Sequence, residues 1–167
     1  FVIGLVACSM LLHEILLTRI CALRLQFHFA FLVISNCLLG MGAAGTLLSL
    51  KHDRFFSEIR LWLTRFCWGY LSALLVTYVF LARFPLPADV SISNARHLLS
   101  LTVFNLVGAL PLFFAGLVIG LLLSADAAKA GRLYAVDLSA AGIGCIACPT
   151  LLPLIGAGGV FTTSALL

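Results

Sequence analysis

Residues 98–123 read LLSLTVFNLVGALPLFFAGLVIGLLL, an apolar stretch that contains no charged side chain and carries Pro111 near its middle. A helix that crosses a bilayer needs about 20 mostly apolar residues. Four further stretches meet this condition, at residues 1–23, 27–50, 61–82 and 133–152. The apolar residues 154–167 are too few to span and predict the start of a sixth helix. The sequence therefore predicts an all-α fold, a polytopic bundle of at least five transmembrane helices and part of a sixth.

The composition excludes most other classes of protein. Of the 167 residues, 63% are hydrophobic and 10% are charged, with a mean hydropathy of +1.19. A soluble domain carries about 25% charged residues. The ten basic and six acidic residues are too few to coat a water-facing surface, and the basic ones lack the clustering of a nucleic-acid-binding face. These values indicate an integral membrane protein, surrounded by the lipid bilayer and without a nucleic-acid partner.

Basic residues between the expected helices predict the orientation. Five lie on one side of the membrane and three on the other: Lys51, Arg54, Arg60, Lys129 and Arg132 against Arg24, Arg83 and Arg96. Cytoplasmic loops carry the excess of Lys and Arg. The first set is therefore expected inside, which predicts a multi-pass protein of the cell membrane with a cytoplasmic N-terminus.

Small residues recur on three of the expected helices. Residues 40–45 read GMGAAG and match the G-x-G-x-x-G pattern of dinucleotide-binding loops. That pattern requires a preceding strand, whereas here it lies inside an apolar helix. Glycines in membrane helices instead allow close approach. We predict tight packing of helices 27–50, 98–123 and 133–152 through Gly40, Gly42, Gly45, Gly116, Gly120 and Gly144.

Glu14 is the charged side chain expected deepest in the bilayer, at roughly 15 Å from the outer edge by helical rise. Other polar side chains reach a comparable level or lie one turn away, and we predict one polar layer comprising Glu14, Thr18, Ser35, Asn36 and Asn105. An intramembrane charge is costly unless it is paired or hydrated. The layer is interpreted as a structural hydrogen-bonded cluster, with a proton or substrate path and an unpaired, protonated Glu14 as alternatives.

Two opposite charges are expected near the inner surface. Arg65 and Asp137 both lie roughly 7 Å inside their helix ends by helical rise. Opposite charges at equal depth on neighbouring helices can neutralise each other, which predicts a pair. In the alternative, each side chain extends separately to water.

Candidate cofactor ligands are few. His28 and His97 are expected at the outer ends of their helices and are weak candidates for axial ligands of a haem or pigment. Cys145 and Cys148 have the spacing of a redox or zinc motif but lack a second pair of ligands. Packing is the simpler interpretation of the two cysteines, and interfacial histidines are common without any ligand. We therefore predict no catalytic residue, no metal ligand and no cofactor.

Several blocks of the sequence resemble one family. They read HEILLTR at residues 13–19, FHFAFL at 27–32, LGMGAAG at 39–45, LPLFFAG at 110–116 and RLYAVDL at 132–138. In this order they are similar to the membrane region of bacterial membrane-bound spermidine synthase-like proteins. In that family the membrane helices precede a cytoplasmic domain related to aminopropyltransferases and methyltransferases.

The resemblance implies a function for the bundle. It would be the integral membrane region of a spermidine synthase-like protein in a bacterial inner membrane. It would act as an anchor, a packing unit or a docking site for partners, without catalysis of its own, because no stretch of this sequence supplies the family's catalytic domain. Expected partners are other membrane subunits or the remainder of its own chain. The alternative is an accessory transmembrane subunit of a larger membrane complex, for example one that transfers electrons or binds pigments.

Overall fold

The computed structural model describes residues 1–24, 30–83, 95–125 and 128–167. The helices in these ranges are α1 (Val2–Arg24), α2 (Ala30–Leu50), α3 (His52–Ser57), α4 (Ile59–Arg83), α5 (Ala95–Ala125) and α6 (Ala130–Leu166). The described ranges contain no strand, and every helix except α3 is long and apolar enough to cross a membrane. The predicted all-α bundle with five spanning helices is therefore confirmed. The orientation of the N-terminus stays a prediction from the charge bias.

The short helix α3 lies between residues 50 and 61, where the sequence predicts a connection between two spanning helices. Phe55 fixes this helix to the bundle and is buried. Its ring packs edge-on against Trp62 and Phe66 of α4, with centroid distances of 4.9 and 5.4 Å. α3 is therefore held by aromatic packing at one end of the bundle.

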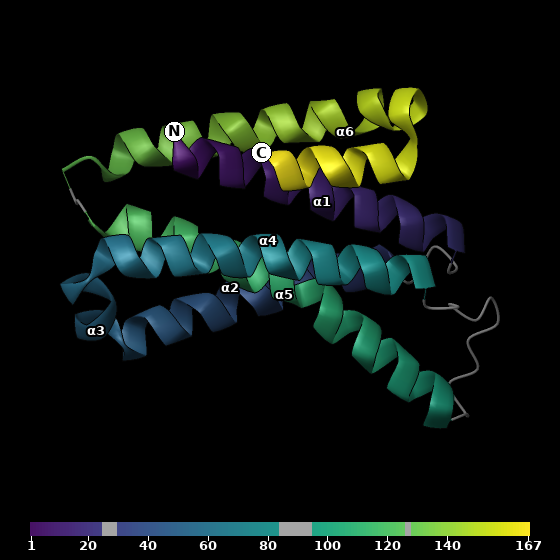
Figure 1. The fold of residues 1–167 in the computed structure, drawn as a ribbon, viewed down its shortest axis with the longest axis horizontal. Helices are drawn as coiled ribbons and strands as arrows, with labels where there is room; N and C mark the ends of the chain where they lie inside the picture. The colour runs from purple at the N-terminus through teal and green to yellow at the C-terminus, as the bar shows by residue number, and fades with distance from the viewer. Residues whose placement is uncertain (25–29, 84–94, 126–127) are drawn as a thin grey trace.

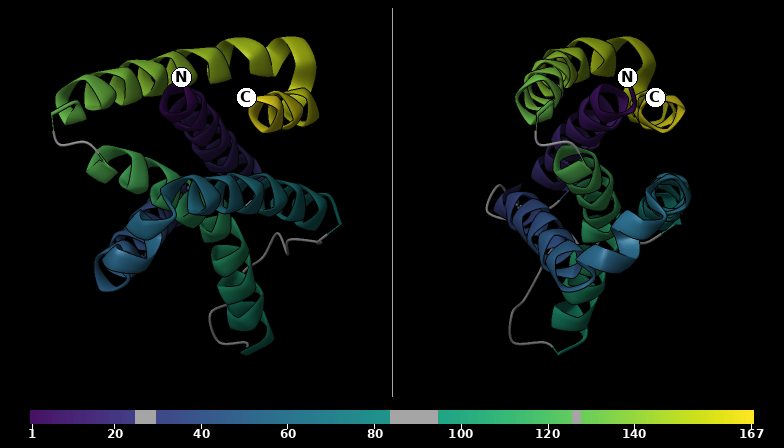
Figure 2. Two further views of the ribbon diagram at one scale, coloured as in Figure 1. Left: turned by 60° about the vertical axis from the view of Figure 1, so that its left-hand side comes forward. Right: turned by 90° about the vertical axis from the view of Figure 1, so that its left-hand side faces the viewer.

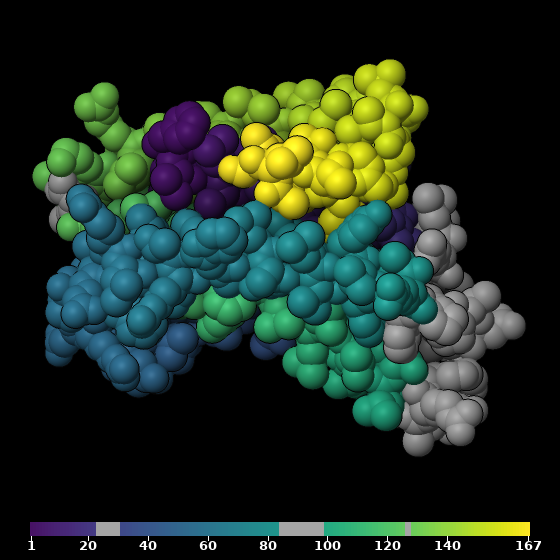
Figure 3. All heavy atoms as spheres, viewed as in Figure 1, coloured from purple at the N-terminus to yellow at the C-terminus, as the bar shows by residue number. Residues whose placement is uncertain are grey.

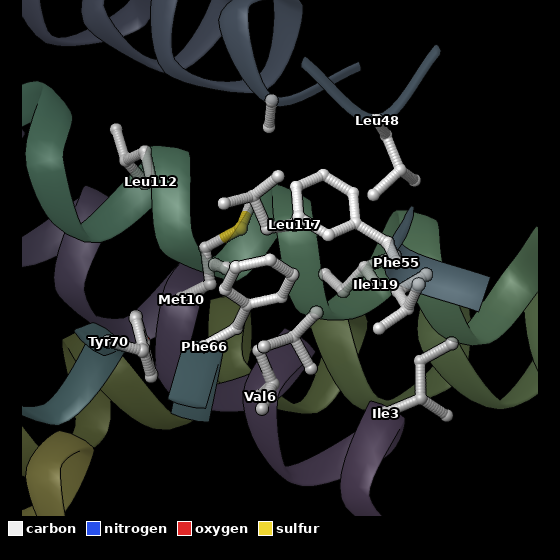
Figure 4. Close-up of a cluster of buried hydrophobic side chains, with 14 of the residues drawn as sticks. Ile3, Val6, Met10, Leu48, Phe55, Phe66, Tyr70, Leu112, Leu117 and Ile119 are labelled. Atoms are coloured by element: carbon white, nitrogen blue, oxygen red, sulfur yellow. The ribbon is translucent and has the colours of Figure 1, made fainter. Parts of the chain in front are cut away.

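α5 occupies the centre of one half of the molecule, where it packs against both α2 and α4. α1 packs mainly against α6, so these two helices form the other half (Figures 1 and 2). A cluster of buried apolar side chains joins the halves. Figure 4 shows Met10 of α1 beside Leu112 and Leu117 of α5, with Phe66 of α4 close by.

Gly156 interrupts α6. Its φ of 69° and ψ of 176° are not helical, and positive φ is readily adopted only by glycine. Residues 157–166, which we call the return arm, fold back beside α1 and α4 (Figure 1, yellow). In Figure 3 the return arm lies against α4, next to the N-terminal turn of α1. The apolar run predicted as the start of a sixth helix thus includes a break and a change of direction.

Glycines mark the closest approaches between helices. A Cβ atom built on Gly40 of α2 would lie 2.9 Å from the carbonyl oxygen of Ala109 in α5. One built on Gly144 of α6 would lie 2.6 Å from the carbonyl oxygen of Cys8 in α1. The sequence predicted that residues 133–152 pack against the two other glycine-bearing helices, but their main partner is α1. In the described structure this part of α6 packs on α1.

The remaining glycines of the prediction divide into two groups. Gly116 and Gly120 of α5 face α2, where added Cβ atoms would lie 2.9 Å from Ala44 Cβ and 3.1 Å from Leu48 Cδ2. Gly42 and Gly45 lie on the opposite, exposed side of α2, and nothing lies within 4 Å of their added Cβ atoms. The GMGAAG segment therefore uses one glycine for internal packing and leaves two on the outer surface.

Candidate functional site

The return arm is joined to the bundle by buried hydrogen bonds. The hydroxyl of Ser9 in α1 donates to the main-chain carbonyl of Ser164. The Tyr70 hydroxyl of α4 lies 2.8 Å from Ser9 Oγ. Because the Ser9 proton is used on Ser164, Tyr70 is the donor in the second bond. One serine thus connects α1, α4 and the return arm.

His13 lies one helical turn beyond Ser9 on the same face of α1 and is fully buried. Its ring packs edge-on against Phe161 of the return arm, with a centroid distance of 5.2 Å. Neither ring nitrogen has a hydrogen-bond partner among the described residues. We call Ser9, His13, Tyr70 and Ser164 the polar seam.

A cavity of about 280 Å³ lies next to the polar seam and shares Phe161 with it. Phe161, which contacts His13, also contributes to the cavity wall and packs against Tyr78 at a centroid distance of 5.2 Å. The other lining residues are Ile20, Leu81, Ala82, Ala157 and Gly158. This wall is apolar apart from the Tyr78 hydroxyl, so the cavity suits a hydrocarbon group and offers little to a charged one.

The chemistry available in the polar seam is limited. Nucleophilic catalysis requires a nucleophile and a base within hydrogen-bond reach of each other, and the His13 nitrogens contact no hydroxyl of the described residues. The described ranges also contain no group of three His, Cys, Asp or Glu side chains placed to hold a metal ion. The bonds that the polar seam does make hold the return arm against α1 and α4.

The predicted polar layer is only partly assembled. The Glu14 side chain is half-buried and faces the thiol of Cys37 on α2. Thr18 donates its hydroxyl proton to the main-chain carbonyl of Glu14, at 2.9 Å, and not to the carboxyl group. Ser35 is exposed and bonds to the carbonyl of Phe31 in its own helix. Ser35 therefore lies outside any cluster around Glu14.

Two amides of the predicted layer are turned toward the interior. Asn36 is buried, and its Nδ2 would lie 3.3 Å from a Cβ atom built on Gly108 of α5. Asn105 of α5 has a buried Oδ1 that lacks a hydrogen-bond partner among the described residues. The two residues thus belong to the interior near the contact of α2 with α5.

The predicted pair of Arg65 and Asp137 does not form. The Arg65 guanidinium lies over the Trp62 ring of its own helix, 5.0 Å from the centroid. Asp137 has a buried Oδ1 without a hydrogen-bond partner in the described structure. The stretch of α6 around Asp137 packs on α1, where Val136 and Ala140 lie against Gly4.

The remaining candidates are two histidines and two cysteines. His28 lies outside the described residues, and so does the side chain of His97. Cys148 is buried in an apolar cluster to which α1 contributes several residues, whereas Cys145 is exposed. The thiols of this motif therefore face different surroundings.

Comparisons with known proteins identify no relative. The chain matches no family model, no curated protein and no solved structure. Its function is therefore inferred from its own residues and their geometry.

Most residues of the polar seam were not predicted from the sequence. Ser9 and His13 lie four residues apart in an apolar helix, and this spacing was the available signal of a shared face. Tyr70 and Ser164 gave no comparable signal, because Ser164 reaches α1 only after the reversal at Gly156. Cys37 could not be identified from the sequence as the neighbour of Glu14, because a cysteine in an apolar helix is ordinarily a packing residue.

Proposed function

We propose that this bundle is the membrane region of a spermidine synthase-like protein and serves as an anchor and docking module without catalysis of its own. The observation that carries the docking role is the outer face of α2. There, Gly42 and Gly45 are exposed, and nothing lies within 4 Å of their added Cβ atoms. Exposed glycines let a second membrane helix approach closely.

Neighbouring side chains extend this face along α2. Ser35, Leu39, Thr46 and Ser49 are all exposed on turns adjacent to the two glycines. α6 offers a similar feature, since Gly142 is exposed and also has nothing within 4 Å of its added Cβ. Both outer surfaces thus combine small side chains with surrounding apolar ones, a composition that favours association between helices over contact with lipid alone.

The placement of the sequence blocks supports the family assignment. The LGMGAAG block lies in α2 and the LPLFFAG block in α5, and the two meet face to face. A Cβ atom on Gly116 would lie 2.9 Å from Ala44 Cβ and 3.0 Å from Met41 Sδ. Residues that carry the resemblance therefore form a close interhelical contact, as expected of motifs that define a membrane fold.

The cavity beside the polar seam fits an anchoring and packing role, because its apolar lining suits a hydrocarbon group. Aminopropyl transfer needs a site that binds a charged sulfonium cofactor and positions an amine nucleophile. The lining of this cavity includes no carboxylate that could hold either cation. Catalysis would then depend on a separate domain of the same protein.

Docking is tested by replacing the exposed glycines. Gly42→Ile combined with Gly45→Ile is expected to abolish a crosslinked or co-migrating partner in native membranes while thermal stability is retained, because the new side chains meet nothing within this chain. Gly131→Ile is the matched control, since it lies on another helix and also has open space around it. An unchanged partner pattern in the double variant would refute docking through α2.

The family assignment is tested by ligand binding. Decarboxylated S-adenosylmethionine is expected to bind the full-length gene product and not the purified 167-residue chain. Saturable binding to the 167-residue chain at micromolar concentration, a common range for enzyme substrates, would overturn the non-catalytic role. Co-purification of a chromophore-bearing partner instead would favour the accessory-subunit alternative.

A further inference from the structure

A second cavity, of about 260 Å³, lies at the end of the bundle where α2, α3, α4 and α5 meet. We propose that it is a binding site for an anionic phospholipid, which places its phosphate beside Lys51 and Arg54 and the upper part of an acyl chain against the aromatic wall. This site is separate from the polar seam and from the docking face of α2. It is independent of the proposed function.

The wall of this cavity is apolar and comes from four helices, with Leu47 as the contribution of α2. Phe55 of α3, Phe66 of α4 and Leu117 of α5 converge there (Figure 4). Phe113 and Phe114 of α5 add two more rings, which pack edge-on against each other at 5.4 Å. Such a surface favours hydrocarbon and gives no hydrogen bonds to a small soluble anion.

Two cations flank this wall. Lys51 and Arg54 line the same cavity, and both are exposed. The Arg54 guanidinium lies 5.7 Å from the centroid of the Trp62 ring, which itself lines the cavity. This cation–π contact holds the guanidinium near the wall. Among the described residues, the ion pair at this end joins His52 to Asp53, and neither Lys51 nor Arg54 takes part in it.

The combination of charge and apolar wall selects the occupant. Basic pockets between membrane helices bind the headgroups of anionic lipids. A zwitterionic lipid would bring its own cation close to Lys51 and Arg54, which offsets the attraction to its phosphate. Inorganic phosphate would leave the aromatic wall uncovered. An anionic phospholipid is the one occupant that satisfies both parts of the cavity.

The proposal can be tested by tryptophan quenching. In the full 167-residue chain, Trp68→Phe leaves Trp62 as the single tryptophan, and Trp62 lines the cavity. The protein is reconstituted into phosphatidylcholine vesicles that contain a low fraction of dibrominated phosphatidylglycerol or, in parallel, dibrominated phosphatidylcholine. We expect stronger quenching by the phosphatidylglycerol. Each of Lys51→Gln and Arg54→Gln is expected to lower the affinity for phosphatidylglycerol relative to phosphatidylcholine about fivefold. One Lys or Arg near an anionic membrane surface contributes about 1 kcal/mol, which corresponds to this factor.

The control is Arg60→Gln, which removes the same charge at the same end from a residue that does not line this cavity. It should change the quenching ratio far less than Arg54→Gln. Equal quenching by the two brominated lipids would overturn the proposal. Equal effects of Arg60→Gln and Arg54→Gln would also overturn it, because they would indicate a general attraction of anionic lipid to this end of the protein. A change in Trp62 emission on adding inorganic phosphate to phosphatidylcholine vesicles would assign the cations to a soluble anion and would also overturn it.

Discussion

The contact of α1 with α6 should be unusually sensitive to a single methyl group at Gly144. The Cβ of Gly144→Ala would lie 2.6 Å from the carbonyl oxygen of Cys8 and 3.3 Å from both its carbonyl carbon and its Cα. These are backbone atoms of a helix, so they cannot move aside by changing rotamer. The two helices must separate locally to admit the methyl group.

The magnitude follows from the lost contacts. A gap of about 0.5–1 Å forfeits a quarter to a half of the dispersion energy of each contact it opens. Packing of this kind is a main source of helix association inside a bilayer. Overpacking in closely fitted interiors costs about 1–3 kcal/mol, and we expect Gly144→Ala to reduce the free energy of unfolding by this amount.

Gly142→Ala provides the matched control. It lies two positions away on the same helix, and its Cβ would meet nothing within 4 Å. Alanine is favoured over glycine in a helix by about 0.5–1 kcal/mol, so this variant should be neutral or slightly stabilised. The assay is reversible unfolding in mixed micelles at increasing fractions of sodium dodecyl sulfate, followed by circular dichroism. Equal midpoints for the two variants would refute the close approach of α1 and α6.

Three further outcomes can be measured in the same unfolding assay. Tyr70→Phe should lower the free energy of unfolding by about 1 kcal/mol, because its hydrogen bond to Ser9 is lost. Tyr78→Phe removes a hydroxyl outside the polar seam and should lower it less. Equal losses in the two variants would argue against the bond. His13→Leu should raise stability by about 1–3 kcal/mol, because the buried imidazole nitrogens lack partners, and a destabilised variant would show that they are satisfied. The changes in unfolding free energy caused by Arg65→Gln and Asp137→Asn should add to within about 0.5 kcal/mol in the double variant. A larger coupling energy would show that the two side chains interact.

The sequence predicted the spanning helices well, because length and hydropathy depend only on local composition. Residues 98–123 needed no knowledge of neighbours to be identified as a helix. The reversal at Gly156 could not be predicted in the same way. Glycine and proline are common in membrane helices, and residues 154–167 are apolar on both sides of the break.

Which helices contact each other could be predicted less well from the sequence. Counting helical rise placed Ser35 and Asn36 at one depth, yet it did not predict that Asn36 is buried and Ser35 exposed. Likewise, the small side chains of α6 indicated close packing without indicating that Gly144 would meet α1. Depth and residue size are properties of one helix, whereas contacts depend on how two helices are rotated about their axes.

The bond between Ser9 and Ser164 also has a consequence for how the bundle is made. These residues are 155 positions apart, and at a synthesis rate of about 5–20 residues per second the second follows the first by about 8–30 s. During that interval α1 enters the membrane without the helix that covers its polar face. Ser9 and His13 of the newly inserted α1 therefore stay without their contacts to Ser164 and Phe161 until the return arm joins the bundle.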